Sequence, residues 1–353
     1  MATQVVFQQP ARDSASPDRQ QGVPSPTLID VAKVAGVSPI TVSRALGRPE
    51  VVSAATRKRV LEAVRATGYV PNLAAGALAS SRSRLVAIFL PTIANSIFAD
   101  TVQALTERLA AAGYQTLLGL TGYDPQQEEA LLEAVLGRRP DGIVLTGTEH
   151  TQASRQRLAR VGIPLVEAWD LCPKPLDMLV GFSHEAVGQA LAHYLLGKGY
   201  RRVSVLSLDD PRGLRRYRSL AQTLAQHGVE PLAAQILPAP ATLAVGRAGL
   251  ARLLQAGSAG EVVVCSSDTL AQGVLAEAAS RGLRVPEDLA VIGFGDLSCA
   301  AHTHPPLSTV RIDGPRIGRA IAEALLARIA EPALARQPLR LDVGFEVIER
   351  GSG

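Results

Sequence analysis

The sequence predicts an α/β protein that begins with a small helical domain. Two observations carry this prediction: residues 25–72 have apolar positions at helical spacing, and from Leu85 onward short apolar runs alternate with longer amphipathic stretches. Strands that alternate with helices in this way are typical of parallel sheets covered on both faces. Because the alternation occurs twice, we expect two lobes. With 353 residues, 47% of them hydrophobic, the chain has enough material for two or three domains with buried cores.

The first 24 residues are rich in Gln, Ser, Pro and Asp, and we predict that they form a disordered tail. They lack the apolar centre of a signal peptide. In addition, no apolar run of the chain approaches the roughly 18 residues of a membrane-spanning helix. We therefore expect a cytoplasmic protein with no membrane partner.

Residues 27–46 have the spacing of a helix-turn-helix. Thr27 followed by Asp30 predicts a capped helix start, and Gly36 predicts its end at a tight turn. Ser38 and Pro39 then suit the N-cap and the first position of a second helix. On that helix Ile40, Thr41, Ser43 and Arg44 would face outward, a small and partly polar set suited to base edges and phosphates.

A third helix is predicted between a Ser53 cap and Gly68, with Arg57 and other basic residues on its polar faces. The charge of the chain is concentrated in this part. Residues 25–84 hold nine Lys or Arg and three acids, a net charge of +6, whereas the whole chain carries +4. This distribution suits a protein in which a basic module binds a polyphosphate and a separate, slightly acidic body senses a ligand.

Four motifs carry a family resemblance: TLIDVAKVAGVS (27–38), TVSRAL (41–46), VSAATRKRV (52–60) and GYVPN (68–72). They resemble the lactose/galactose-repressor family of bacterial transcription regulators. The resemblance implies a three-helix DNA-binding domain over residues 25–72, binding to double-stranded operator DNA and a homodimer. Our candidate DNA-binding residues are Thr27, Ser38, Pro39, Ile40, Thr41, Ser43, Arg44, Arg57, Asn72 and Leu78.

The resemblance also implies that residues 73–84 are a hinge that becomes helical only on operator DNA. There, Leu78 of each subunit would wedge into the minor groove and kink the duplex. Gly76 stands where relatives commonly have a polar or basic residue, and Gly costs a helix about 1 kcal/mol relative to Ala. We therefore predict a hinge that orders less readily and makes fewer phosphate contacts.

The remaining chain, residues 85–353, is predicted to be the effector-binding and dimerisation core. The first half should contain strands 85–90, 116–120, 142–146 and 163–167 and helices 99–112, 126–136 and 152–161. The second half should contain strands 203–208, 261–265 and 289–293 and helices near 184–196, 214–226, 245–254 and 270–281. The resemblance implies a periplasmic-binding-protein-like core that crosses between lobes near residues 181, 311 and 338. Lobe 1 would then span about 85–181 and 312–338, and lobe 2 about 182–311 and 339–353.

Motifs for catalysis and metal binding are incomplete. Residues 293–298, GFGDLS, lack the third Gly of a dinucleotide fingerprint, and residues 181–185, GFSHE, lack the closing Gly of a nucleophile elbow. Cys172, Cys265 and Cys299 are odd in number and widely spaced, which argues against a disulfide framework and a zinc site. We expect neither an enzyme nor a bound metal or cofactor.

Ligand is expected in the cleft at the carboxyl ends of the strands. By motif position the resemblance implies lining residues Thr92, Ile93, Asn95, Phe98, Thr148, Glu149, Glu167, Trp169, Phe182, Ser267 and Asp296. Arg218 lies where the family commonly places an Arg that contacts sugar hydroxyls or a carboxylate, and Arg212 is a second candidate. The run RGLRRYR, 212–218, also fits an ordinary basic helix start.

The effector expected from these residues is a sugar acid. Many relatives carry an acid at Gly295 that holds sugar hydroxyls, and its absence argues against a neutral sugar. The runs AGYQTLLG, DGIVLTGTEHT, GIPLVEAWD and LDMLVGFSHE look most like the gluconate-operon repressor branch, which favours gluconate or 2-ketogluconate. The Trp169 ring would cover the polyol while an Arg holds the carboxylate.

A homodimer would read half-sites about one helical turn apart.

Two alternatives stay open. A corepressor-dependent regulator would bind DNA more strongly with its ligand, and the ligand could then be a different sugar or metabolite. A sugar-acid binding or transport receptor, in which the basic module is incidental, is the third hypothesis, and the lack of an export signal argues against it.

Overall fold

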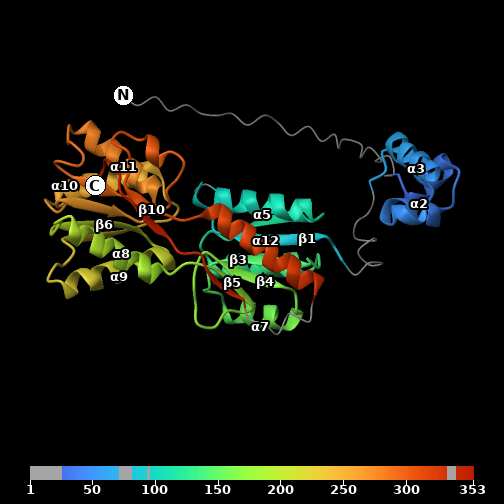
Figure 1. Cartoon of the computed structure of the whole chain (residues 1–353), viewed down its shortest axis with the longest axis horizontal. Coiled ribbons are helices and arrows are strands. Elements are labelled where there is room, and N and C mark those ends of the chain that lie inside the picture. The colour runs from blue at the N-terminus through green and yellow to red at the C-terminus, as the bar shows by residue number, and fades with distance from the viewer. Residues whose placement is uncertain (1–25, 71–81, 94–95, 332–338) are drawn as a thin grey trace, which may run out of the picture. The chain divides into compact units, whose positions relative to one another are not determined.

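The computed structural model describes residues 26–70, 82–93, 96–331 and 339–353, which form two compact units divided after Ala79 (Figure 1). The predictions for Asn72, Gly76, Leu78 and Asn95 therefore lie outside the described residues. Within the described ranges, no helix is long and apolar enough to cross a membrane.

The N-terminal unit is the predicted three-helix domain. It consists of α1 (Leu28–Ala35), α2 (Pro39–Gly47), a 3-10 turn η1 (Pro49–Val51) and α3 (Ala54–Thr67). Thr27 and Asp30 form a reciprocal capping box, and Gly36 ends α1 with a φ of 62°, in the left-handed region that glycine tolerates. Val31, Val42 and Val60 are fully buried and give the unit its core, together with buried Ala residues from all three helices.

Lobe 1 of the second unit is a six-stranded parallel sheet in the order β11-β5-β4-β3-β1-β2. Its strands are β1 (Leu85–Leu90), β2 (Gln115–Leu120), β3 (Gly142–Thr146), β4 (Leu165–Ala168), β5 (Met178–Gly181) and β11 (Arg340–Asp342). The helices α5 (Ala99–Ala111) and α12 (Gly314–Ala330) cover one face. The helices α6 (Pro125–Leu136) and α7 (Gln152–Val161) cover the other. A short 3-10 turn, η2 (Ser96–Phe98), precedes α5.

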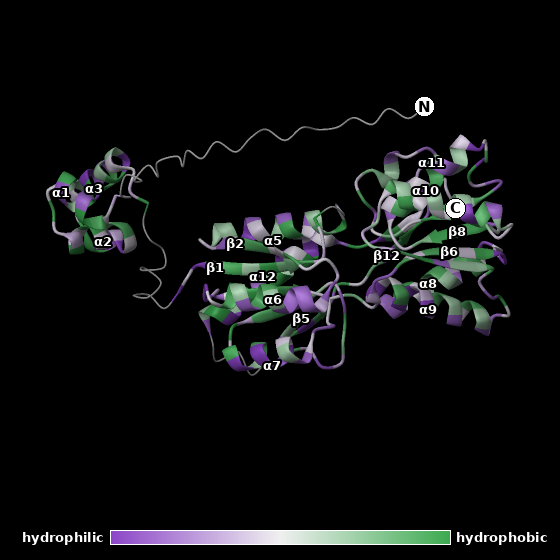
Figure 2. Cartoon of the chain, turned by 180° about the vertical axis from the view of Figure 1, so that it is seen from behind, coloured by the Kyte–Doolittle hydropathy of each residue, from purple (hydrophilic) through white to green (hydrophobic). Residues whose placement is uncertain are grey.

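Lobe 2 repeats this plan with a four-stranded parallel sheet in the order β7-β6-β8-β9. The strands are β6 (Val203–Leu208), β7 (Ala233–Leu237), β8 (Val262–Cys265) and β9 (Ala290–Ile292). The helices α8 (His184–Gly197) and α9 (Pro211–Gln226) cover one face, and α10 (Leu243–Gln255) and α11 (Asp268–Ser280) cover the other. Figure 2 shows the consequence, since the strands of both lobes are mostly hydrophobic and the polar residues gather on the helices.

Two short strands connect the lobes, and they correct one predicted boundary. β10 (Thr309–Arg311) pairs antiparallel with β12 (Glu346–Ile348), whereas β11 pairs with β5 in the sheet of lobe 1. The chain therefore stays with lobe 1 through Asp342, and the crossing predicted near residue 338 lies later. The edge strand β11 is only three residues long and has no apolar run that would have revealed it.

Several elements were missing from the prediction or began elsewhere. The strands β5, β7, β10, β11 and β12, the helix α12 and the 3-10 turn η3 (Ala300–His302) were not identified from the sequence. α9 begins at Pro211, three residues before the predicted start, because Asp210 Oδ1 accepts the N–H groups of Arg212 and Gly213. This earlier start places Arg212 in the first turn of the helix.

Candidate DNA-binding surface and ligand cleft

The second helix of the N-terminal unit presents the candidate base-reading residues. Pro39, Ile40, Ser43 and Arg44 are exposed on α2, whereas Val42 on its other side is fully buried. Ile40 is 64% exposed, and an apolar side chain in that position suits contact with a thymine methyl group, while Arg suits the two acceptors of guanine. The helix thus has the exposed face that direct reading of bases requires.

Candidate polar residues at the helix starts are engaged in caps. Thr27 Oγ1 donates to Asp30 Oδ2 at 2.7 Å, and Ser38 Oγ accepts the N–H of Thr41 at 3.2 Å. Thr27 and Ser38 remain exposed at helix N-termini, where the helix dipole favours a phosphate. Arg57 is exposed on α3 and adds positive charge.

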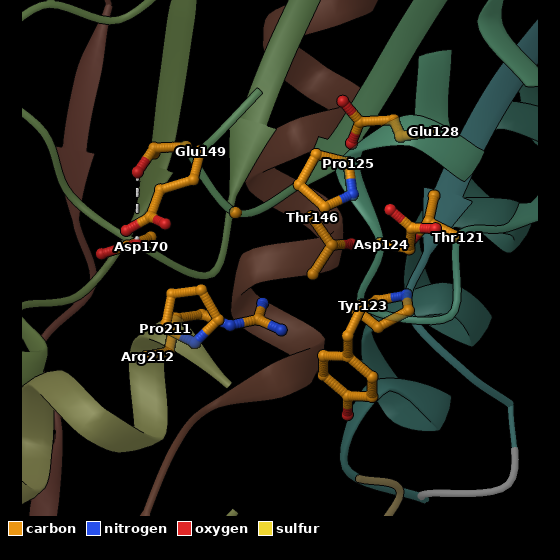
Figure 3. A pocket seen from close by; sticks show the side chains of 13 residues that line it. Thr121, Tyr123, Asp124, Pro125, Glu128, Thr146, Glu149, Asp170, Pro211 and Arg212 are labelled. Carbon is orange, nitrogen blue, oxygen red and sulfur yellow. Dashed lines mark hydrogen bonds between the residues drawn. The ribbon is translucent and has the colours of Figure 1, made fainter. Parts of the chain in front are cut away.

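The ligand cleft lies between the lobes, where loops follow the carboxyl ends of the strands of both sheets. It contains two cavities that share Tyr123 and Arg212 in their walls. The larger, the acid chamber, has a volume of about 120 Å³ and is lined by the carboxylates of Asp124, Glu128, Glu149 and Asp170 (Figure 3). The smaller, the donor chamber, has a volume of about 40 Å³. Its polar and aromatic lining residues are Phe98, Tyr123, Trp169, His184, Asp210, Arg212, Arg216, Ser266, Ser267 and Phe294.

Arg212 reaches from the first turn of α9 into the cleft, toward Thr146 and Tyr123 (Figure 3). Its guanidinium carbon lies 5.6 Å from the centre of the Phe98 ring, and its Nε lies 3.8 Å from Asp210 Oδ1. Among the described residues, its buried Nη1 has no hydrogen-bond partner, and neither has the buried Nε1 of Trp169. Both atoms are donors, so they can be satisfied only by an acceptor.

Arg216 lies one turn further along α9 and is buried in the wall of the donor chamber. Its guanidinium carbon lies 3.8 Å from the centre of the Phe294 ring. Its Nη1 donates to His184 Nδ1 at 3.0 Å, and its Nη2 donates to the carbonyl of Ser266 at 3.1 Å. Burial lowers the pKa of Arg216 to about 10, although Asp210 opposes the shift, so the group is charged at neutral pH.

His184 is the neutral partner of this arginine. Burial, followed by the charges of Arg216 and Arg212, holds its pKa well below the usual 6.5. Its Nε2 donates to the carbonyl of Trp169 at 2.9 Å, which leaves Nδ1 free to accept from Arg216. Because His184 is uncharged, the excess positive charge of the donor chamber comes from Arg212 and Arg216, set against Asp210.

Two cations contact the carboxylates of the acid chamber. His150 Nδ1 lies 2.7 Å from Glu128 Oε1, and its Nε2 lies 3.3 Å from Glu167 Oε1. Burial alone would lower the pKa of His150, but the two glutamates raise it to about 9, so the ring is protonated. Arg215 of α9 reaches across the cleft, with Nη1 2.7 Å from Asp170 Oδ1 and Nη2 2.9 Å from Glu149 Oε1.

Six of the predicted lining residues do line the cavities: Phe98, Thr148, Glu149, Trp169, Arg212 and Ser267. Thr92 and Ile93 lie outside both cavities, and Ile93 is 67% exposed. Phe182 is fully buried and supports the cleft from beneath, with its ring 5.9 Å from that of Trp169.

Two predicted acidic candidates are engaged elsewhere. Glu167 is fully buried in β4, where it contacts His150 and accepts the N–H of Leu176, because its side chain points away from the cleft. Asp296 forms ion pairs with Arg311 and Arg350, at 2.7 Å in each case, beside the crossing strands. The prediction that either residue lines the cleft is therefore wrong.

The prediction for Arg218 is also wrong. Arg218 is exposed, whereas Arg212 and Arg216 are buried toward the cleft. Arg218 follows Arg216 by two positions, which is a rotation of about 200° around an α-helix, so Arg218 faces away from the cleft. The sequence indicated a basic helix start but left the rotation of the helix undetermined, and the start at Pro211 decides it.

The analysis of the sequence missed the residues that complete both chambers: Tyr123, Asp124, Glu128, Asp170, Asp210, Arg216 and Phe294. A signal was present for two of them, because Asp-Pro follows a strand at both Asp124 and Asp210 and starts a helix there. Tyr123 has a φ of 64°, an uncommon backbone conformation for a bulky residue, and it projects the ring into the cleft.

Comparison with known proteins agrees with both units. The family model for bacterial regulatory proteins of the lacI family matches residues 27–72, and that for a periplasmic binding protein-like domain matches residues 192–353. The chain is 40% identical to the HTH-type transcriptional regulator GntR of Pseudomonas aeruginosa, over 93% of this chain and 95% of that protein. It is 32% identical to the regulator of the same name from Escherichia coli K12, over 93% and 98%.

A solved structure matches both units as well. The LacI family transcriptional regulator of Silicibacter pomeroyi matches with a TM-score of 0.86 and 33% identity, covering 92% of this chain and 98% of that one. These relatives are transcription regulators rather than enzymes. The chain therefore belongs to the lacI family of bacterial regulatory proteins and is a DNA-binding transcriptional repressor.

Proposed function

We propose that this repressor is a homodimer controlled by a sugar acid that binds between its lobes, with gluconate or 2-ketogluconate as the favoured effector. The observation that carries the proposal is the pair of buried donors in the donor chamber, Trp169 Nε1 and Arg212 Nη1, which lack acceptors within the described ranges. Operator DNA, bound by the N-terminal unit in the cytoplasm, is the second partner.

The donors favour a ligand that supplies acceptors. A buried polar group without a partner costs about 1–3 kcal/mol, so an oxygen ligand that accepts hydrogen bonds from both groups removes this cost when it binds. A carboxylate offers about four acceptor sites, and hydrogen bonds from Arg to an anion are roughly twice as strong as neutral ones. A neutral sugar would supply acceptors but would leave the positive charge of Arg212 and Arg216 uncompensated.

The position of the site between the lobes supports control by a population shift. Trp169 and Phe98 belong to lobe 1 and Arg212 and Arg216 to lobe 2, so a ligand that contacts all four favours one arrangement of the lobes. A ligand shifts the equilibrium only by its differential affinity for the two arrangements. Lobe 1 begins directly after the hinge segment, and Asp141 accepts the N–H groups of Ser83 and Arg84 there.

The test couples ligand binding to DNA binding. Gluconate and 2-ketogluconate are titrated into the full-length protein by calorimetry, and operator affinity is measured by fluorescence anisotropy with and without each ligand. We expect binding that lowers operator affinity at least tenfold, which corresponds to about 1.4 kcal/mol of coupling. An increase in operator affinity would support the corepressor alternative. If neither acid binds, the effector part of the proposal fails and the DNA-binding part stands.

A further inference from the structure

We propose that the cleft is polarised and selects sugar acids that carry one anionic group, at one end only. The carboxylate would lie in the donor chamber and the uncharged polyol chain in the acid chamber. This inference rests on the proposed function, because it names the class of effector that the same cleft accepts and the classes that it rejects.

The donor chamber suits the carboxylate by charge and by size. Arg212 and Arg216 line it together with a single carboxylate among the described residues, Asp210, whose Oδ1 accepts two backbone N–H groups at the start of α9. The free donors Trp169 Nε1 and Arg212 Nη1 add two positions for anionic oxygens. With a volume of about 40 Å³, this chamber admits a compact group and excludes an extended chain.

The acid chamber has the opposite charge. Four carboxylates line it against one arginine, Arg212, which it shares with the donor chamber. The other cations in contact with the carboxylates, His150 and Arg215, are shared with two further acids, Glu167 and Glu185. Of the described residues, the acids in this group outnumber the cations. None of these ion pairs involves Asp124, whose carboxylate instead caps α6 by accepting the N–H of Gln126 at 2.9 Å.

The acid chamber also suits a polyol. Carboxylate oxygens accept hydrogen bonds from hydroxyl groups, and the Thr121, Thr146 and Thr148 side chains add hydroxyls to its lining. Its volume of about 120 Å³ is the larger of the two, as expected for the longer part of the ligand. Tyr123 and Arg212 line both chambers, so a single extended ligand passes between these two side chains.

A second anionic group at the far end of the ligand would lie among the carboxylates. Like charges at contact distance repel strongly in the partly buried environment of the cleft, where water screens them little, and this repulsion opposes binding. The geometry therefore rejects aldarates, which have a carboxylate at each end, and aldonates that are phosphorylated at the far end. A neutral alditol would be rejected for the opposite reason, because it leaves the charge of the donor chamber unpaired.

Four ligands of matched length test this polarity: gluconate, glucarate, 6-phosphogluconate and glucitol, each titrated into the full-length protein by calorimetry. We expect gluconate to bind at least tenfold more tightly than each of the other three. Equal or tighter binding of glucarate or 6-phosphogluconate would overturn the polarity and leave a sugar-acid effector in place. Absence of binding by all four would overturn both this inference and the effector part of the proposed function.

Variants locate the two ends of the ligand. Arg212→Gln should weaken gluconate binding at least tenfold, whereas Arg218→Gln, its exposed control on the same helix, should leave it unchanged. Glu128→Gln and Glu149→Gln should each narrow the preference for gluconate over glucarate severalfold by removing a negative charge from the acid chamber. Glu133→Gln, with a side chain 73% exposed on α6, is their control.

Thermal unfolding and operator binding without ligand establish that each variant is folded. A preference for gluconate over glucarate that is unchanged in both folded Glu variants would overturn the placement of the polyol in the acid chamber. Tight gluconate binding by a folded Arg212→Gln protein would overturn the placement of its carboxylate.

Discussion

The N-terminal unit and the cleft present their functional side chains in opposite ways. On α2, Ile40, Ser43 and Arg44 are exposed, lie within five residues of one another, and depend on local caps for their positions. In the cleft, Trp169, Arg212 and Arg216 are buried and come from two lobes. One short segment therefore forms the candidate base-reading surface, whereas the ligand cleft forms only when segments that are distant in the sequence come together.

Removing a buried cleft arginine should have the largest effect. Arg216→Met would leave His184 Nδ1 and the Ser266 carbonyl without their donor and remove a positive charge from the donor chamber. We expect gluconate binding to fall about a hundredfold or more, equivalent to about 2.7 kcal/mol, while operator binding without ligand stays intact. Calorimetry and anisotropy check this, with Arg218→Met as the exposed control. A normal response to gluconate would remove Arg216 from the site.

Arg44→Ala should produce the reverse pattern. If Arg44 contacts a base, operator affinity should fall by about 1–3 kcal/mol and the preference at one base pair should relax, with gluconate binding unchanged. Arg57→Ala on α3 is the comparison, because Arg57 is exposed there and, if it contacts a phosphate, its loss should weaken binding to all operators equally and reduce the salt slope by about one. Anisotropy with a set of operators altered at single base pairs distinguishes these outcomes. An unchanged profile for Arg44→Ala would exclude Arg44 from readout.

Loss of a helix cap tests whether local contacts hold the N-terminal unit. Ser53 Oγ accepts the N–H of Thr56 at the start of α3, and Ser53→Ala should destabilise this unit by about 1 kcal/mol. Operator affinity should fall modestly in consequence, and the affinity for gluconate should not change. Chemical denaturation of the full chain, followed at the N-terminal unit by hydrogen exchange, measures the effect. A loss of gluconate binding in this variant would contradict the independence of the two regions.

The pH dependence of the stability of the core should reflect the charge of His150. The folded protein raises the pKa of His150 to about 9 from the usual 6.5, so the stabilisation is fully present below about pH 6.5 and is lost as the pH rises through 9. Thermal stability should therefore decline gradually from pH 7 to 10. His150→Gln should flatten this decline, whereas His193→Gln, at an exposed position, should not. Equal slopes for the wild-type and His150→Gln proteins would contradict a protonated His150.

Local patterns predicted much of the fold but little of the cleft. The caps at Thr27 and Ser38 and the apolar spacing around Val42 placed α1 and α2 correctly, because the interactions that define these helices lie within a few residues. The long apolar strand β1 was equally clear. In contrast, β11 is a three-residue edge strand that depends on its pairing with β5, and no local signal marks it.

The candidate site shows the same division at single residues. Phe98 and Trp169 were expected in the cleft from motif position and Arg212 as a second candidate beside Arg218, and all three line the donor chamber. Arg218 was expected in the cleft, but Arg216 lies there. A shift of two positions along a helix turns a side chain to the opposite face, and the cap at Asp210, which fixes where α9 begins, was not recognised from the sequence.

Spacing, caps and net charge are properties of neighbouring residues, so the helix-turn-helix, the basic charge at residues 25–84 and the repeated α/β pattern follow from the amino-acid sequence alone. Which charged groups meet depends on how the chain folds in three dimensions. Parallel strands bring their carboxyl ends together from distant parts of the chain, so the joining of Glu149 and Asp170 to Arg215, and the separation of an acid chamber from a donor chamber, arise when the two lobes face each other.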